Sequence, residues 1–207
     1  MNKRLKIEIY KSFWFGEIYN GSPSVFVEFN TGDFDEDVVI GEVANKILYC
    51  MNSYDNLVFC GDDPSLFSGW EGLLIVLDMQ DLMRVKGGRA YIVKTTGIAF
   101  PEFWDKYNDL YFVVCVDKGL CYKEGYMKKL KSFNNKGAYF RFNVRDKNDL
   151  NFVDSIMDKI GIDTYRVSLF LGNVKKRFLD EVLSYALDRG FCILDINNNI
   201  KKFDVRR

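Results

Sequence analysis

The chain has 207 residues, of which 48% are hydrophobic and 28% are charged, as expected for a folded globular protein with a substantial core. It contains no histidine and five cysteines, none of them spaced as C-x-x-C. This excludes a Ser-His-Asp triad, a His-ligated zinc, a zinc ribbon and a thioredoxin-type motif. The net charge is zero, but residues 12–83 contain thirteen acids and one base, whereas both flanking segments are basic. Such an asymmetry can steer a partner, unless the two halves interleave and their charges pair.

Eight short segments rich in Val, Ile, Phe and Tyr have the pattern of β-strands. They are Leu5–Phe13, Ser24–Phe29, Leu57–Cys60, Arg89–Thr95, Leu110–Asp117, Ala138–Val144, Arg166–Leu171 and Phe191–Ile196. Helical patterns lie between them, at Val38–Met51, Leu150–Ile160 and Lys175–Arg189. Helix ends are indicated by Gly161, by Gly190 and by the pair Gly87-Gly88, and Asp146 is expected to cap a helix start.

Strands that alternate with helices predict right-handed crossovers and a mostly parallel sheet. The longest apolar run, Leu110–Val116, is much shorter than the roughly 20 residues that span a bilayer. No repeat or Pro-rich linker divides the chain, so we expect one α/β domain over residues 1–207, without a membrane anchor. Scattered cysteines and a start that does not look like a signal segment predict a cytoplasmic protein.

Ligands of open parallel sheets bind beyond the carboxyl ends of the strands. Among the residues that follow predicted strands, we nominate six as ligand-binding candidates. They are Gly61, Asp62, Asp63, Thr95, Thr96 and Lys118. Lys118 could hold a phosphate or carboxylate as a point charge, or be an ordinary surface lysine.

No metal site is expected. Asp33, Asp35 and Asp37 alternate like the start of a calcium loop, but Val38 and Ala44 occupy the positions that need Gly and Glu, so an acidic surface loop is favoured. Tyr, Phe and Lys mix over Tyr122–Phe142, which resembles a nucleic-acid surface only superficially, because alternation can turn the aromatic side chains inward.

Several strand ends resemble, in the same order, the motifs of radical S-adenosylmethionine (SAM) enzymes, and most closely the 7-carboxy-7-deazaguanine synthase family. The activase of anaerobic ribonucleotide reductase is a weaker match. The family patterns are G-E-G-x-x-x-G-x-P-x-x-F-V-R, then G-G-E-P, E-T-N-G and S-P-K. The corresponding segments are Gly16–Glu17, Gly21–Glu28, Cys60–Pro64, Lys94–Gly97 and Val116–Lys118. Each motif is degenerate, and their order over nearly the whole chain carries the resemblance.

The resemblance lacks one defining feature. The family holds an iron–sulfur cluster with a C-x-x-x-C-x-x-C loop after the F-V-R strand, whereas the loop Asn30–Asp37 contains carboxylates and no cysteine. Hard carboxylates do not hold such clusters. The family's Arg after F-V is Glu28 here and its Glu in E-T-N-G is Lys94, and Asp62 stands at or next to a family glycine. The chemistry of the family is therefore expected to be lost.

The resemblance implies an α/β fold, with a partial or open (β/α) barrel and a mostly parallel sheet. We expect a non-catalytic binding or interaction protein with no cofactor, neither an iron–sulfur cluster nor SAM. Its partner would be a protein or a second copy of the chain, rather than nucleic acid or a membrane. Two alternatives stay open. One is a small-molecule binding protein or enzyme that uses the strand-end residues for a nucleotide, a purine-like base or SAM. The other is a subunit of a larger assembly, for example a viral one.

Overall fold

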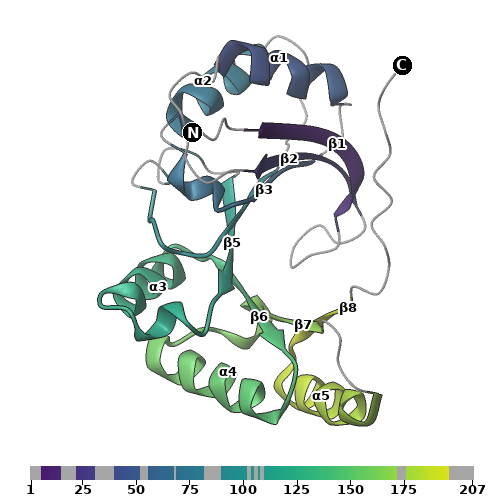
Figure 1. Cartoon of the computed structure of the whole chain (residues 1–207), viewed down its shortest axis with the longest axis vertical. Helices are drawn as coiled ribbons and strands as arrows, with labels where there is room; N and C mark the ends of the chain where they lie inside the picture. Colours follow the sequence, from purple (N-terminus) through teal and green to yellow (C-terminus); the bar gives the residue numbers. More distant parts are fainter. Residues whose placement is uncertain are drawn as a thin grey trace.

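The computed structural model describes residues 6–14, 22–30, 40–51, 56–67, 69–81, 90–101, 104, 107, 110–171 and 176–195. Its strands form one eight-stranded sheet whose spatial order is the chain order. The strands are β1 (Lys6–Trp14), β2 (Ser22–Asn30), β3 (Asn56–Gly61), β4 (Tyr91–Thr95), β5 (Leu110–Val116), β6 (Tyr139–Val144), β7 (Val167–Leu171) and β8 (Cys192–Asp195). β1 pairs antiparallel with β2, and every other neighbouring pair is parallel. The sheet curves but does not close, because β1 and β8 are its two end strands (Figure 1).

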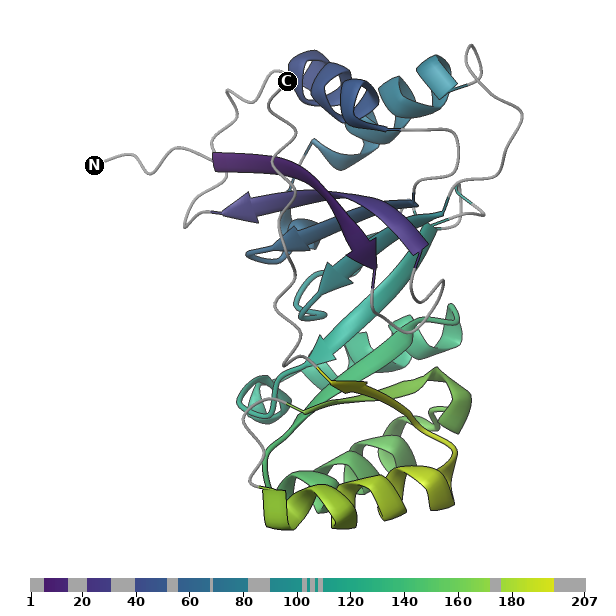
Figure 2. The same ribbon diagram turned by 90° about the vertical axis from the view of Figure 1, so that its right-hand side faces the viewer.

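The helices cover the outer side of the curved sheet. Figure 1 shows α1 and α2 at the end that holds β1–β3, and α3, α4 and α5 around β5–β8; Figure 2 shows the same layers from the side. The helices are α1 (Ile40–Cys50), α2 (Trp70–Asp81), α3 (Tyr126–Asn135), α4 (Lys147–Ile160) and α5 (Lys176–Arg189), with short 3₁₀ turns η1 (Pro64–Leu66), η3 (Leu120–Tyr122) and η4 (Thr164–Arg166). In the part of the chain that the structure describes, no helix is both long and apolar enough to cross a membrane.

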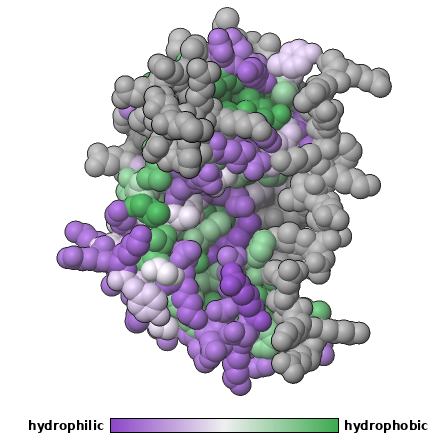
Figure 3. All heavy atoms as spheres, viewed as in Figure 1, coloured by the Kyte–Doolittle hydropathy of each residue, from purple (hydrophilic) through white to green (hydrophobic). Residues whose placement is uncertain are grey.

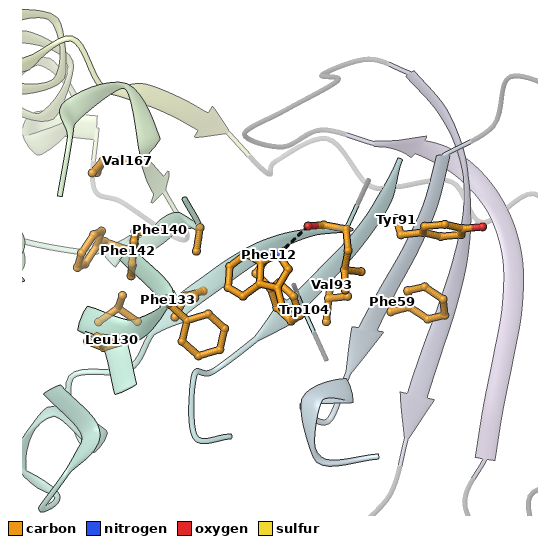
Figure 4. Packing of buried hydrophobic residues seen from close by; sticks show 14 of the residues in the cluster. Phe59, Tyr91, Val93, Trp104, Phe112, Leu130, Phe133, Phe140, Phe142 and Val167 are labelled. Atoms are coloured by element: carbon orange, nitrogen blue, oxygen red, sulfur yellow. Dashed lines mark hydrogen bonds between the residues drawn. The ribbon is translucent and has the colours of Figure 1, made fainter. Parts of the chain in front are cut away.

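The main core lies between the sheet and the helices. Its centre is aromatic: the ring centroid of Trp104 lies 4.2 Å from that of Phe112 and 5.8 Å from that of Phe133 (Figure 4). The Nε1 of Trp104 donates to the Leu110 carbonyl at 3.0 Å. Offset and tilted aromatic pairs of this kind contribute about 1 kcal/mol each beyond their burial. Because the indole N–H has a partner, the ring can be buried without an unsatisfied polar group.

A smaller apolar cluster lies on the inner face of the sheet. It contains Trp14, Phe26, Val58, Cys60, Ile92 and Val113. Side chains alternate along each strand, so Val25 and Val27 pack under the helices while Phe26 points inward. The sheet is therefore covered by helices on one face, and its other face carries a separate set of side chains.

The structure confirms the predicted α/β class and all eight predicted strands to within two residues at each end. The Asp146 side chain caps α4 by accepting from the N–H groups of Asn148 and Asp149 at 2.8 and 3.2 Å. Gly161 and Gly190 both have the predicted positive φ, at 69° and 70°. The pair Gly87-Gly88 lies outside the described residues.

Helix α3 was not expected from the sequence, where Tyr122–Phe142 mixes aromatic residues with lysines and alternation suggested that the aromatic side chains turn inward. Its buried residues, Tyr126, Leu130 and Phe133, are spaced four and three apart, which is one face of a helix. The lysines between them occupy the solvent side, so the segment has an ordinary amphipathic pattern that its high lysine content conceals.

Candidate functional site

The Asp63 carboxylate is the centre of a hydrogen-bond network at the carboxyl ends of β3 and β4. Its Oδ1 accepts from the Ser65 N–H at 3.2 Å, from the Ser65 hydroxyl at 2.5 Å and from the Thr95 hydroxyl at 2.7 Å. Its Oδ2 accepts from the Thr96 N–H at 2.9 Å and from the Thr96 hydroxyl. Asp63 is only 7% exposed, so these donors replace the water that a buried carboxylate would otherwise lose.

The backbone at this turn is as constrained as the side chain. Asp63 has a left-handed conformation, with φ 47° and ψ 81°, and caps the turn η1. Gly61 has φ 102°, and a Cβ there would lie 2.1 Å from the Phe29 carbonyl oxygen. The N–H of Asp62 donates to that same oxygen at 2.7 Å. The turn therefore needs glycine at position 61, and the Asp63 hydrogen bonds offset a conformation that costs a non-glycine residue about 1 kcal/mol.

Two more bonds connect this network to the surrounding elements. Thr95 accepts from the Gly97 N–H at 2.9 Å, and the Tyr126 hydroxyl of α3 donates to the Thr96 carbonyl at 2.6 Å. Burial raises the pKa of Tyr126 well above its ordinary value, so the hydroxyl stays a neutral donor. The network thus joins η1, the end of β4 and the start of α3.

Lys118 lies apart from this network. Its Nζ is 3.3 Å from the carboxylate of Asp149 and 5.5 Å from the centre of the Phe152 ring, both on α4. The structure therefore brings together three of the six nominated residues, Asp63, Thr95 and Thr96, with Ser65. It places Gly61 and Asp62 in the adjoining turn and directs Lys118 toward α4. The donors gathered around Asp63 all serve the protein's own carboxylate, and this arrangement fixes the strand ends.

A second set of polar residues, on the inner face of the sheet, follows one row of the strand register. Glu8 pairs with Glu28, and Glu28 pairs with Cys60. Lys94 follows the Phe59–Val93 pair, so it lies beside Cys60 on the next strand. Neighbouring strands are about 4.8 Å apart, so this row places two carboxylates, a thiol and an ammonium across about 14 Å. We call Glu8, Glu28, Cys60 and Lys94 the inner row.

Tyr10 lies directly below the inner row. Its ring stacks on Phe26, with centroids 5.3 Å apart and planes 2° from parallel, and its hydroxyl is hydrogen-bonded to Glu28. Burial raises the pKa of Tyr10 well above its ordinary value, and the nearby Cys60 and Glu28 raise it further. Tyr10 is therefore a neutral hydrogen-bond donor to the inner row at any physiological pH.

The floor of the inner face is formed by Trp14 and Arg141. Trp14 pairs with Ser22, the first residue of β2, and therefore lies at the amino end of the parallel strands. The Arg141 guanidinium of β6 is 5.6 Å from the Trp14 ring centre and 6.0 Å from that of Phe170. Because β1 and β6 are far apart in the sheet, this contact crosses the concave side. Side chains fill the concavity there, and the inner row lies above them.

The strand-end rule did not select Glu8, Tyr10 or Arg141, because they point to the inner face in mid-strand. One signal was available. In β1 the even positions include Glu8 and Tyr10 while Ile7 and Ile9 take the odd ones, which marks the even face as the polar one. Among the residues that the structure describes, no three Cys, Asp or Glu side chains converge as a metal site would require.

An open, mostly parallel sheet with all its described helices on the outer side defines a partial (β/α) barrel. The crystal structure of QueE from Escherichia coli is similar to this chain, with a TM-score of 0.66 over 94% of each chain and 12% sequence identity. This similarity confirms the predicted radical SAM fold, and at this identity it speaks to the fold alone. No protein-family model and no curated protein matches the sequence.

Proposed function

We propose that this chain is a non-catalytic binding protein built on the radical SAM fold. The observation that carries the proposal is the donor set of the loop after β2. The first cysteine of the chain is Cys50, at the end of α1. The acidic residues at 33, 35, 36 and 37 lie outside the described residues, in the segment between β2 and α1 that corresponds in sequence to the cysteine motif of the family. Iron–sulfur clusters need soft thiolates, so the residues of this loop do not fit the cluster.

The described cysteines do not supply an alternative set of three thiolate ligands for a cluster. Cys50 and Cys121 lie in α1 and η3, on the helix side of the sheet, whereas Cys60 and Cys115 belong to β3 and β5. With β4 between them, the two strand cysteines are separated by about 10 Å of sheet. A cluster held by one loop has no equivalent in this arrangement, and we derive no cluster chemistry for this chain.

Anaerobic reconstitution with iron and sulfide tests the proposal. We expect no cluster absorption and no electron paramagnetic resonance signal above that of a Cys60→Ser/Cys115→Ser variant, which controls for iron bound adventitiously by the strand cysteines. A stable cluster in the parent chain that reductively cleaves SAM would contradict the proposal, because it would restore the chemistry of the family.

The inner row favours a second candidate, a small-molecule binding protein. Two carboxylates, a lysine and a neutral tyrosine hydroxyl lie together above an aromatic and cationic floor, which is a set able to recognise a nucleotide, a purine-like base or SAM. In this candidate the edge of the binding site is held in place by the strand-end residues Gly61–Asp63, Thr95 and Thr96. A thermal-shift screen with these ligands tests it, with Glu28→Gln as the variant and Lys118→Ala as the control. Equal shifts in all three proteins, or none, count against an inner-row site.

A further inference from the structure

A groove between the end strand β1 and helix α1 lies outside the sites described above. It has a volume of about 370 Å³ and is lined by Ile7, Ile9, Asn45, Lys46, Tyr49 and Cys50. Figure 3 shows hydrophobic residues reaching the surface in the region between α1 and β1. Tyr49 is 75% exposed, which is unusual for a large aromatic side chain beside an apolar groove.

The apolar lining continues the main core to the surface. Ile7 and Ile9 pair with Phe29 and Val27, which are both fully buried under the helices. On β1, an end strand of the sheet, Ile7 and Ile9 are only half-buried. The hydrophobic layer that the helices complete over β2 is therefore incomplete over β1, and water contacts apolar surface there at a free-energy cost.

The charged lining residue that the structure describes is positive. Lys46 is an exposed lining residue on α1. Lys11 follows Ile9 on the same face of β1. Burial raises the pKa of the Cys50 thiol, and the positive charge of Lys11 acts in the opposite direction. Lys11 therefore lies close to the lining residue Cys50. Among the residues that the structure describes, the lining includes no acidic residue, and Glu8 of β1 points to the inner face. A ligand that matches this surface is apolar along β1 and carries a carboxylate near the two lysines.

We infer that this groove binds an extended protein segment that carries two apolar residues and an acidic residue at successive alternate positions. The spacing follows from β1 itself, where Ile7, Ile9 and Lys11 lie two residues apart on one face. A segment laid along an end strand matches that spacing with its own two-residue period, which is how strand addition combines main-chain pairing with side-chain pockets. The inference rests on the proposed binding role and names the partner's chemistry.

A synthetic probe can test this directly. The probe is fluorescein-labelled Thr-Val-Thr-Val-Thr-Glu-Thr, and its fluorescence anisotropy reports binding to the full chain. Two control peptides replace Glu with Lys or place the two Val residues side by side. We expect each control peptide to bind about tenfold more weakly or worse, because it loses the charge match or the two-residue period.

Variants of the protein place the probe. Lys46→Glu should weaken binding of the Glu probe about tenfold and improve binding of the Lys peptide. The control variant Lys131→Glu, at an exposed position of α3, should change neither. Both residues are exposed on helices, so both variants should fold. Bound probe should also slow alkylation of Cys50 by iodoacetamide while leaving Cys121, in η3, unchanged, and should slow hydrogen exchange in residues 6–14.

The inference is overturned if the Glu and Lys peptides bind alike, or if Lys46→Glu and Lys131→Glu behave alike. It is also overturned if light scattering shows that the chain self-associates without any peptide and that Lys46→Glu dissociates it, since the occupant would then be a second copy. Cluster reconstitution tests the loss of radical chemistry separately. Binding of a cluster but not of the probe would contradict both the proposed function and this inference. Binding of neither would contradict only the inference about the groove.

Discussion

The strand-end network and the inner row use the same kinds of residue to opposite effect. Around Asp63 the donors of Ser65, Thr95 and Thr96 are directed at one buried carboxylate, and the result is a fixed turn between β3 and β4. In the inner row, Glu8 and Glu28 face each other on neighbouring strands, which is unfavourable for stability. A polar residue after a strand can therefore be structural, while a less favourable set in mid-strand is the better candidate for binding.

The largest effect should come from removing the centre of the network. Asp63→Ala should lower the free energy of unfolding by about 3–5 kcal/mol, because the buried donors of Thr95 and Thr96 lose their acceptor. Asp63→Asn keeps the shape and one acceptor oxygen, so it should cost about half as much. Urea unfolding measures both. A loss below about 1 kcal/mol for Asp63→Ala would mean that the network does not hold the strand ends.

The inner row should respond as a coupled set of charges. The resemblance implies Arg and Glu at the positions that Glu28 and Lys94 occupy, so the two reversals together preserve an opposite-charge combination. Glu28→Lys removes the repulsion from Glu8 but places a second cation near Lys94, so adding Lys94→Glu should raise the free energy of unfolding by about 0.5 kcal/mol relative to Glu28→Lys alone. A double-mutant cycle measures the coupling, and strictly additive effects would show that the two side chains do not interact.

A matched pair of tyrosines compares the two regions at high pH. Tyr10→Phe on the inner face and Tyr126→Phe in the network should each cost about 1 kcal/mol, because each removes one hydrogen bond. Both folded-state pKa values are raised by burial, so the unfolded chain ionises first. The stability from these tyrosines is full below a pH of about 10, the ordinary tyrosine pKa, and is lost as the pH rises beyond it. The free energy of unfolding should therefore fall above that pH, and fall less steeply in either variant. Unchanged slopes would contradict the burial.

The smallest effect should come from the nominated residue that lies apart. Lys118→Ala removes a half-exposed ion pair with Asp149 and should change the free energy of unfolding by less than about 0.5 kcal/mol. Thermal unfolding in low and high salt measures it. A loss of more than about 1 kcal/mol would show that Lys118 contributes to the strand-end structure after all.

Local patterns in the sequence were sufficient for most of the fold. The two-residue period located the strands, and Asp146, Gly161 and Gly190 marked helix ends through the chemistry of their own positions. Helix α3 was missed because its lysines obscure the spacing of Tyr126, Leu130 and Phe133. The spacing of these three residues identifies a helix only once the packing of their side chains is known.

The candidate site was less accessible from the sequence, for a physical reason. Two of the three partners of Asp63, Thr95 and Thr96, are 32 and 33 residues away, so the local sequence does not distinguish a carboxylate that binds a ligand from one that caps its own turn. The inner row likewise depends on strand register, which aligns Glu8, Glu28 and Cys60 across three strands. The missing cysteines were visible at once, because the absence of a ligand type needs no geometry.

We propose that this chain has the fold without the cluster, and introducing cysteine ligands is the sharpest test of that proposal. Asp33→Cys/Asp37→Cys/Ile40→Cys recreates the C-x-x-x-C-x-x-C spacing between β2 and the first residue of α1. The measurement is iron bound per chain after anaerobic reconstitution of the parent and of this variant. We predict no stoichiometric cluster iron in the parent and a cluster signal in the variant. A parent chain that binds a full cluster would contradict the account.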